Sequence, residues 1–118
     1  MENTYGWVGK ILKIDLTNRK ISTIDTMAYA YEYIGGRGIA DRIAYEEISG
    51  DVDGFDPENR LIIMSGPLTG TMAPASGRVE FAGVAPQTYP RPWYTRANMG
   101  GRFGSELKYS GFDGIVIF

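Results

Sequence analysis

The stretch from residue 66 to residue 104 opens with GPLTGTMAPASGR (66–78) and closes with NMGGRFG (98–104). Each of these two segments combines glycines with an arginine, and each borders a regular element that the pattern predicts. Glycine has no Cβ and lets the backbone approach a ligand closely. The first N–H groups of a helix attract anions, and arginine presents a planar fork of donors that fits phosphate. These residues alone therefore predict a site for a phosphorylated or otherwise anionic ligand.

Short strands and helices alternate on both sides of this stretch. The periodicity and the turn residues predict strands at residues 6–15, 21–24, 61–65, 78–85, 93–97 and 114–118. They predict helices at residues 26–34, 39–48 and 102–109. We expect a bulge at Gly9 in the first strand, and we expect Gly35 and Gly36 to end the first helix. The order of elements predicts an α+β fold with a mainly antiparallel or mixed sheet, in one domain over residues 1–118.

The composition narrows the functional classes. The net charge of −2 gives no overall field that would favour nucleic acid. No run of apolar residues is long enough to span a membrane, and the N-terminus lacks the pattern of a secretion signal, so we expect a cytoplasmic protein.

The chain has neither cysteine nor histidine. This excludes disulfides, the usual zinc sites and an iron–sulfur cluster held by this chain alone. Redox chemistry would have to come from a cofactor or another domain.

Seven motifs follow one another along the whole chain. They are GW…L.IDLT (6–17), IGGRG (34–38), PEN.LI (57–62), GPLTGT.AP (66–74), GR (77–78), NMGG.FGSELK (98–108) and GFD (111–113). In this order and spacing the sequence resembles the N-terminal domain of the aldehyde ferredoxin oxidoreductase family. The combination is much more specific than any single motif.

The resemblance implies a part of a larger oxidoreductase. Enzymes of this family use tungsten, sometimes molybdenum, held by two pterins, to oxidise aldehydes to carboxylic acids, and they pass the electrons to ferredoxin. A four-iron four-sulfur cluster is held by cysteines of later domains. The N-terminal domain is a β-rich base on which the pterins sit. We therefore expect no catalytic residue, no activity and no bound cofactor in this chain alone.

The resemblance also assigns the cofactor contacts. It implies that Arg78, Asn98, Gly100 and Gly101 bind the tungstopterin. It further implies that the backbone carbonyl of Asn98 holds a magnesium ion that bridges the pterin phosphates. These assignments agree with the anion site that the glycines and arginines predict.

Each of these residues also has an ordinary structural interpretation. Arg78 could pair with Glu80 or Glu106 at the surface, and residues 98–101 could be a helix entry with an asparagine cap. We expect Arg37 to lie at a helix C-terminus, where it would offset the helix dipole. Thr69 and Thr71 are expected to form turns through side-chain-to-backbone hydrogen bonds.

The expected partners follow from the same considerations. They are the remaining domains or a catalytic partner subunit, ferredoxin for the complete enzyme, and a possible second copy, with no nucleic acid and no membrane. The last residues, IVIF (115–118), are apolar without a polar tail, which favours a fragment or one half of an assembly. The alternative is a separate small non-catalytic subunit or truncated paralogue that acts as an interaction module, with its last strand as a pairing edge.

Overall fold

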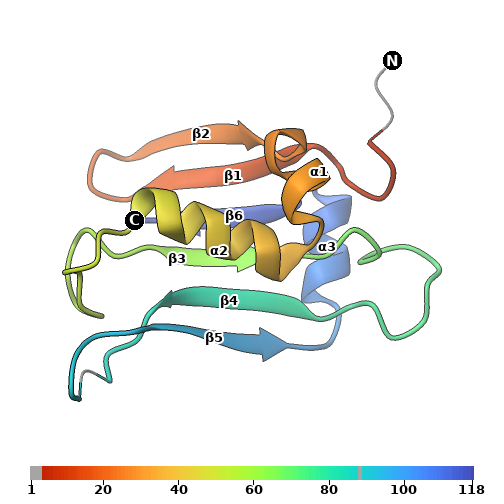
Figure 1. Cartoon of the computed structure of the whole chain (residues 1–118). Helices are drawn as coiled ribbons and strands as arrows, with labels where there is room; N and C mark the ends of the chain where they lie inside the picture. The colour runs from red at the N-terminus through yellow and green to blue at the C-terminus, as the bar shows by residue number, and fades with distance from the viewer. Residues whose placement is uncertain (1–3, 88) are drawn as a thin grey trace.

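The computed structural model describes residues 4–87 and 89–118, and it contains one six-stranded sheet in the order β2-β1-β6-β3-β4-β5 (Figure 1). β1 and β6 are parallel, whereas every other neighbouring pair is antiparallel. The strands are β1 (Lys10–Asp15), β2 (Lys20–Asp25), β3 (Leu61–Met64), β4 (Val79–Val84), β5 (Tyr94–Met99) and β6 (Gly114–Ile117). The helices are α1 (Met27–Tyr33), α2 (Gly36–Glu47) and α3 (Phe103–Tyr109). This mixed sheet with three helices confirms the predicted α+β fold.

The core lies between α1, α2 and one face of the sheet (Figure 1). Ile39 and Ile43, four residues apart on α2, are buried against this face. Ile62 of β3 and Val116 of β6 are opposite each other in register, and both are fully buried. None of the helices in residues 4–87 and 89–118 is long and apolar enough to cross a membrane.

The last strand lies inside the sheet. β6 pairs with β1 on one side and with β3 on the other, so its backbone groups are already bonded. The prediction that this strand is a pairing edge is therefore wrong, because the edges of the sheet are β2 and β5. A continuously apolar stretch such as IVIF is typical of a central strand, because both faces of such a strand are shielded from water.

The first strand begins later than the sequence predicts. Residues 6–9 precede β1, so Gly9, with a φ of +105°, lies just outside the strand. The N–H groups of Val8 and Gly9 donate to the side chain of Asp113 at 2.8 and 2.7 Å. A distant carboxylate thus accepts these two N–H groups, while the carbonyl of Gly9 accepts the N–H of Thr26 at 3.1 Å.

The second helix begins earlier than the sequence predicts. Ile34, with a φ of +62°, ends α1, and Gly36 already belongs to α2. A Cβ on Gly36 would lie 2.8 Å from the carbonyl oxygen of Ser65, and one on Gly38 would lie 2.2 Å from that of Tyr33. The first helix therefore ends just before Gly35, as predicted, whereas Gly36 and Gly38 lie in α2 and allow close packing of helices and strand. Arg37 consequently lies in the first turn of α2, and its expected position at a helix C-terminus is wrong.

The contact between α1 and α2 gives a prediction for alkaline pH. Burial, together with the hydrogen bond that the Tyr29 hydroxyl donates to Glu46 at 2.9 Å, raises the pKa of Tyr29 to about 12. Because this pKa lies above the unfolded value of 10.0, the contribution of Tyr29 to stability is complete below pH 10 and is lost as the pH rises towards 12. We expect a late phenolate step in an ultraviolet absorbance titration of the folded chain. Tyr29→Phe should remove one phenolate from this late rise, to which Tyr94 also contributes because its pKa is raised as well, and an unchanged titration would contradict the assignment.

Candidate functional site

The two glycine–arginine segments meet at one end of the sheet (Figure 1). Residues 66–78 join β3 to β4, and residues 98–104 lead from β5 into α3. A Cβ on Gly77 would lie 3.3 Å from the carbonyl oxygen of Gly101, and one on Gly104 would lie 2.9 Å from that of Gly77. The fold thus brings together the two segments that the sequence analysis singled out separately.

Side-chain hydrogen bonds hold the first segment in shape. Thr69, 2% exposed, donates from Oγ1 to the carbonyl of Ser76 at 2.8 Å and accepts the N–H of Gly66 at 3.1 Å. Thr71 donates from Oγ1 to the carbonyl of Leu68 at 2.6 Å. These contacts confirm that both threonines form turns. Hydrogen bonds of its own side chains therefore fix the shape of the loop at residues 66–78, which we call the platform.

Arg78 is exposed at the start of β4. Among residues 4–87 and 89–118, its guanidinium has no hydrogen-bond or ion-pair partner. The carboxylate of Glu80 pairs instead with Arg37 and Arg96, in each case at 3.7 Å from the Nε atom. The structural interpretation in which Arg78 pairs with Glu80 or Glu106 is therefore wrong, and the charge of Arg78 is available.

Asn98 lies in β5, opposite Glu80 of β4, and it is exposed. It is not a helix cap, because α3 begins after Arg102 and its N-terminus has no side-chain cap in the described residues. The helix-entry interpretation of Asn98 is therefore wrong. The strand pattern missed this placement because it predicted that β5 ends at Ala97.

The glycines after Asn98 face open space. Gly101 has a φ of +85°, so its backbone needs glycine. Gly100 has no such conformation, and a Cβ on it would meet nothing within 4 Å. The fold of the described residues therefore does not explain why position 100 is glycine. An external group that approaches the backbone there would explain it.

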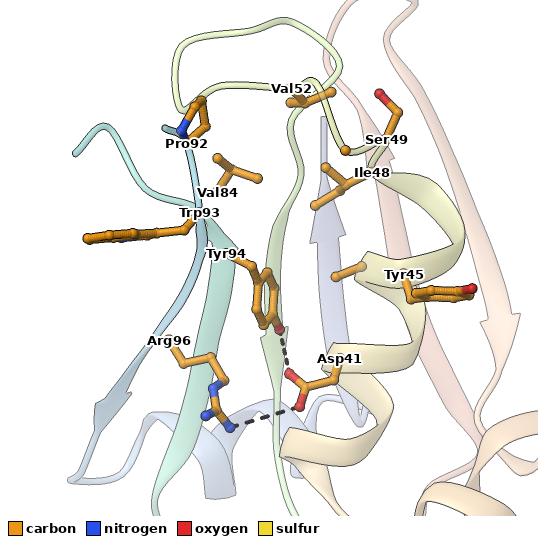
Figure 2. Close-up of a pocket in the computed structure, with 12 residues that line it drawn as sticks. Asp41, Tyr45, Ile48, Ser49, Val52, Val84, Pro92, Trp93, Tyr94 and Arg96 are labelled. Atoms are coloured by element: carbon orange, nitrogen blue, oxygen red, sulfur yellow. Dashed lines mark hydrogen bonds and ion pairs between the residues drawn. The ribbon is translucent and has the colours of Figure 1, made fainter. Parts of the chain in front are cut away.

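A cavity of about 440 Å³ lies between α2, the loop at residues 49–52 and the start of β5 (Figure 2). Sequence reasoning missed it, because its walls come from three separate parts of the chain. At one end the Tyr94 hydroxyl donates to Asp41 at 2.7 Å, and Arg96 lies 3.9 Å from the same carboxylate. Burial and the hydrogen bond to Asp41 raise the pKa of Tyr94 above its ordinary value.

A mixed six-stranded sheet with three helices agrees with the β-rich base that the family resemblance implies. The profile of the aldehyde ferredoxin oxidoreductase N-terminal domain matches residues 11–118. The chain therefore belongs to the aldehyde ferredoxin oxidoreductase family, as its N-terminal domain.

Particular relatives agree with this assignment. The tungsten-containing aldehyde ferredoxin oxidoreductases of Pyrococcus furiosus and Pyrococcus abyssi are 40% and 41% identical over 114 and 115 residues. A WOR-like subunit of an aliphatic sulfonate oxidoreductase from Pyrococcus furiosus is 30% identical over 117 residues. These alignments cover 96% of this chain but 18% of each relative.

A solved structure shows the same fold. It is the active-site complex BamBC of benzoyl coenzyme A reductase with 1,5-dienoyl-CoA, which superposes with a TM-score of 0.88 at 35% identity. The superposition covers 96% of this chain and 17% of that chain. The chain thus corresponds to less than a fifth of the proteins that it resembles.

Proposed function

We propose that this chain is the tungstopterin-binding N-terminal part of an aldehyde ferredoxin oxidoreductase. The observation that carries the proposal is the guanidinium of Arg78, which has no partner among the described residues and lies where the backbone of Gly100 and Gly101 meets the loop at residues 66–78. Two tungsten-containing relatives at 40% identity support the choice of metal. When bound, the tungsten–pterin group would supply the oxidation of an aldehyde to a carboxylic acid, with ferredoxin as electron acceptor.

The residues of this chain fit an anionic cofactor. Arg78 would neutralise a phosphate of the pterin through charge-assisted hydrogen bonds. Gly100 and Gly101 would let that phosphate approach the backbone, because no side chain occupies the space in front of them. The backbone carbonyl of Asn98 would hold a magnesium ion between phosphates, since magnesium prefers oxygen ligands. We assign no proton transfer to this chain, whose role would be positioning and charge neutralisation.

The electron-transfer group would lie elsewhere in the enzyme. An iron–sulfur cluster needs thiolate ligands, and this chain has no cysteine. The remaining four-fifths of the relatives' length would supply those ligands and the acid–base residues.

Replacing Arg78 by alanine tests the proposal in the enzyme that contains this domain. We expect a lower content of tungsten and pterin after purification, because a hydrogen bond to a charged group contributes about 1.5–3 kcal/mol to binding. Elemental analysis and the fluorescence of oxidised pterin measure both quantities. Arg91→Ala is the matched control, since Arg91 is an exposed arginine at the opposite end of β5. Equal tungsten and pterin in the two variants would refute the proposal.

A further inference from the structure

We propose that Arg37 is a second arginine of the anion site around Arg78, and that Glu80 is the positioning residue that holds Arg37 towards this site. The ligand group would be a phosphate-type oxyanion that both arginines contact. This inference rests on the function proposed above, and it adds one contact residue and one positioning residue to that site.

The position of Arg37 is unfavourable for the helix on its own. Arg37 is the second residue of α2, where the positive end of the helix dipole repels a cation. The first turn of α2 contains no acidic residue that would offset this repulsion. The side chain of Arg37 is 61% exposed, so it is free to reach a ligand. A bound oxyanion would be attracted both by Arg37 and by the N-terminus of α2.

The end of α2 also lies against the predicted site. A Cβ on Gly36 would lie 2.8 Å from the carbonyl oxygen of Ser65 and 3.0 Å from that of Met64. Ser65 immediately precedes the loop at residues 66–78. The first turn of α2 therefore packs on the point where β3 enters the glycine-rich loop, which fixes the helix relative to that loop.

The burial and the contacts of Glu80 support the proposal independently of the helix N-terminus. Its side chain is 7% exposed, and its Oε1 atom lies 3.7 Å from the Nε atoms of both Arg37 and Arg96. This buried oxygen has no hydrogen-bond partner in the described part of the chain. A buried carboxylate without such a partner is costly, and it is retained where it organises charges around it. Here the charges of two arginines converge on it.

Among the residues described, Arg96 forms two ion pairs, whereas Arg37 forms one. Arg96 pairs with the carboxylate of Glu80 at 3.7 Å and with that of Asp41 at 3.9 Å. Asp41 also accepts the hydroxyl of Tyr94 (Figure 2). Arg37 has only the single contact with Glu80 among the residues described. The donors that Arg37 keeps available are therefore the ones that a ligand can use.

Glu80 links Arg37 to the neighbourhood of Arg78. Arg78 immediately precedes β4 and Glu80 is the second residue of that strand, so the two lie within about 7 Å of each other along the chain. Asn98 is opposite Glu80 in β5 and shares its face of the sheet. Because Arg37 contacts Glu80 from α2, we infer that its long side chain reaches an oxyanion bound at Arg78 and Gly100.

The test uses inorganic pyrophosphate as a probe on the 118-residue chain, with binding followed by the NMR shifts of the Gly100 and Gly101 amides. Arg37→Ala should weaken pyrophosphate binding about tenfold or more, which is the effect of one lost charge-assisted hydrogen bond. Arg42→Ala is the control in the same helix, because the Nε of Arg42 already donates to Glu46 at 2.7 Å. Arg42→Ala should bind pyrophosphate as the original chain does.

A double-mutant cycle tests the role of Glu80. Glu80→Gln keeps the shape but removes the charge that holds Arg37. In that background Arg37→Ala should cost much less affinity than it does alone, because Arg37 is no longer positioned. A general electrostatic role would instead raise the affinity for pyrophosphate in Glu80→Gln and leave the two effects additive. That result would overturn the positioning role.

The outcomes separate this inference from the proposed function. If Arg78→Ala loses affinity while Arg37→Ala binds like Arg42→Ala, the inference about Arg37 is wrong and the proposed function stands. If Arg78→Ala binds like the original chain, or if the original chain shows no saturable shift, the anion site itself is refuted. Loss in both Arg78→Ala and Arg37→Ala, with Arg42→Ala unchanged, supports both.

Discussion

Asp113→Ala is expected to remove a large part of the stability of this domain. The side chain of Asp113 is fully buried, and it accepts the N–H groups of Val8 and Gly9 and the hydroxyl of Thr26, the last at 2.6 Å. Its Oδ1 atom also lies 3.2 Å from the Nζ of Lys108. One carboxylate therefore ties the N-terminal segment, α1 and α3 to the start of β6.

The expected loss is large because of what the substitution leaves behind. The side chain of Lys108 is 5% exposed, and burial lowers the pKa of Lys108 against the opposing effect of Asp113. Removing one partner of a buried ion pair costs about 3–5 kcal/mol. A domain of this size has a free energy of unfolding of about 5–15 kcal/mol, so the expected loss is about a third of the total or more.

Chemical denaturation followed by circular dichroism measures this effect. Asp56→Ala is the matched control, because the half-buried side chain of Asp56 accepts, among the residues described, only the local N–H of Glu58 at 2.8 Å. Asp113→Asn, which keeps an acceptor oxygen, should lie between Asp113→Ala and the original chain and remains measurable if the alanine variant does not fold. A loss in Asp113→Ala no larger than that in Asp56→Ala would show that the carboxylate does not hold these segments together.

Local patterns predicted the elements of this fold well. The hairpin at the N-terminus, the three helices and the strands on both sides of the glycine-rich loop follow from periodicity and turn residues, which act within a few positions. The turn before β2 is of this kind, because Asp15 accepts the N–H of Asn18 three residues later. Such contacts join residues that are close together in the sequence, so the sequence alone can predict them.

Long-range contacts account for the predictions that were wrong. The central position of β6 depends on pairing with β1, about a hundred residues earlier, which no local pattern encodes. The placement of Arg37 in the first turn of α2 depends on close packing of glycines against Tyr33 and Ser65. A glycine that serves packing and a glycine that ends a helix look the same in a single sequence.

The candidate site also contains residues that the sequence predicts and contacts that only the structure reveals. Arg78, Asn98, Gly100 and Gly101 were predicted from local chemistry and from the family resemblance, and they remain a proposal for cofactor binding. Glu80 was considered only as a surface partner for Arg78. Its actual contacts with Arg37 and Arg96 depend on the register of β4 with β5 and on the packing of α2, and neither can be read from residue spacing.

Gly104→Ala is expected to destabilise the domain although alanine favours a helix. Gly104 lies in α3, where alanine would gain about 1 kcal/mol from helix propensity alone. A Cβ there would lie 2.7 Å from Val79 Cγ1, 2.8 Å from Thr69 Cγ2 and 2.9 Å from the carbonyl oxygen of Gly77. Overpacking of this kind costs about 1–3 kcal/mol, and the oxygen of Gly77 is backbone that cannot rotate away. We therefore expect a net loss of stability.

The same substitution should change the distance between the two segments of the site, because Gly104 is where α3 packs against the loop that precedes Arg78. Thermal unfolding measures the stability, and the NMR shifts of the Gly77 and Gly101 amides report the separation of the two segments. Gly100→Ala is the matched control: its Cβ would meet nothing within 4 Å, so stability should change by no more than about 0.5 kcal/mol. If Gly104→Ala is instead as stable as the original chain, α3 is free to move away from the loop, and the platform is not fixed by this contact.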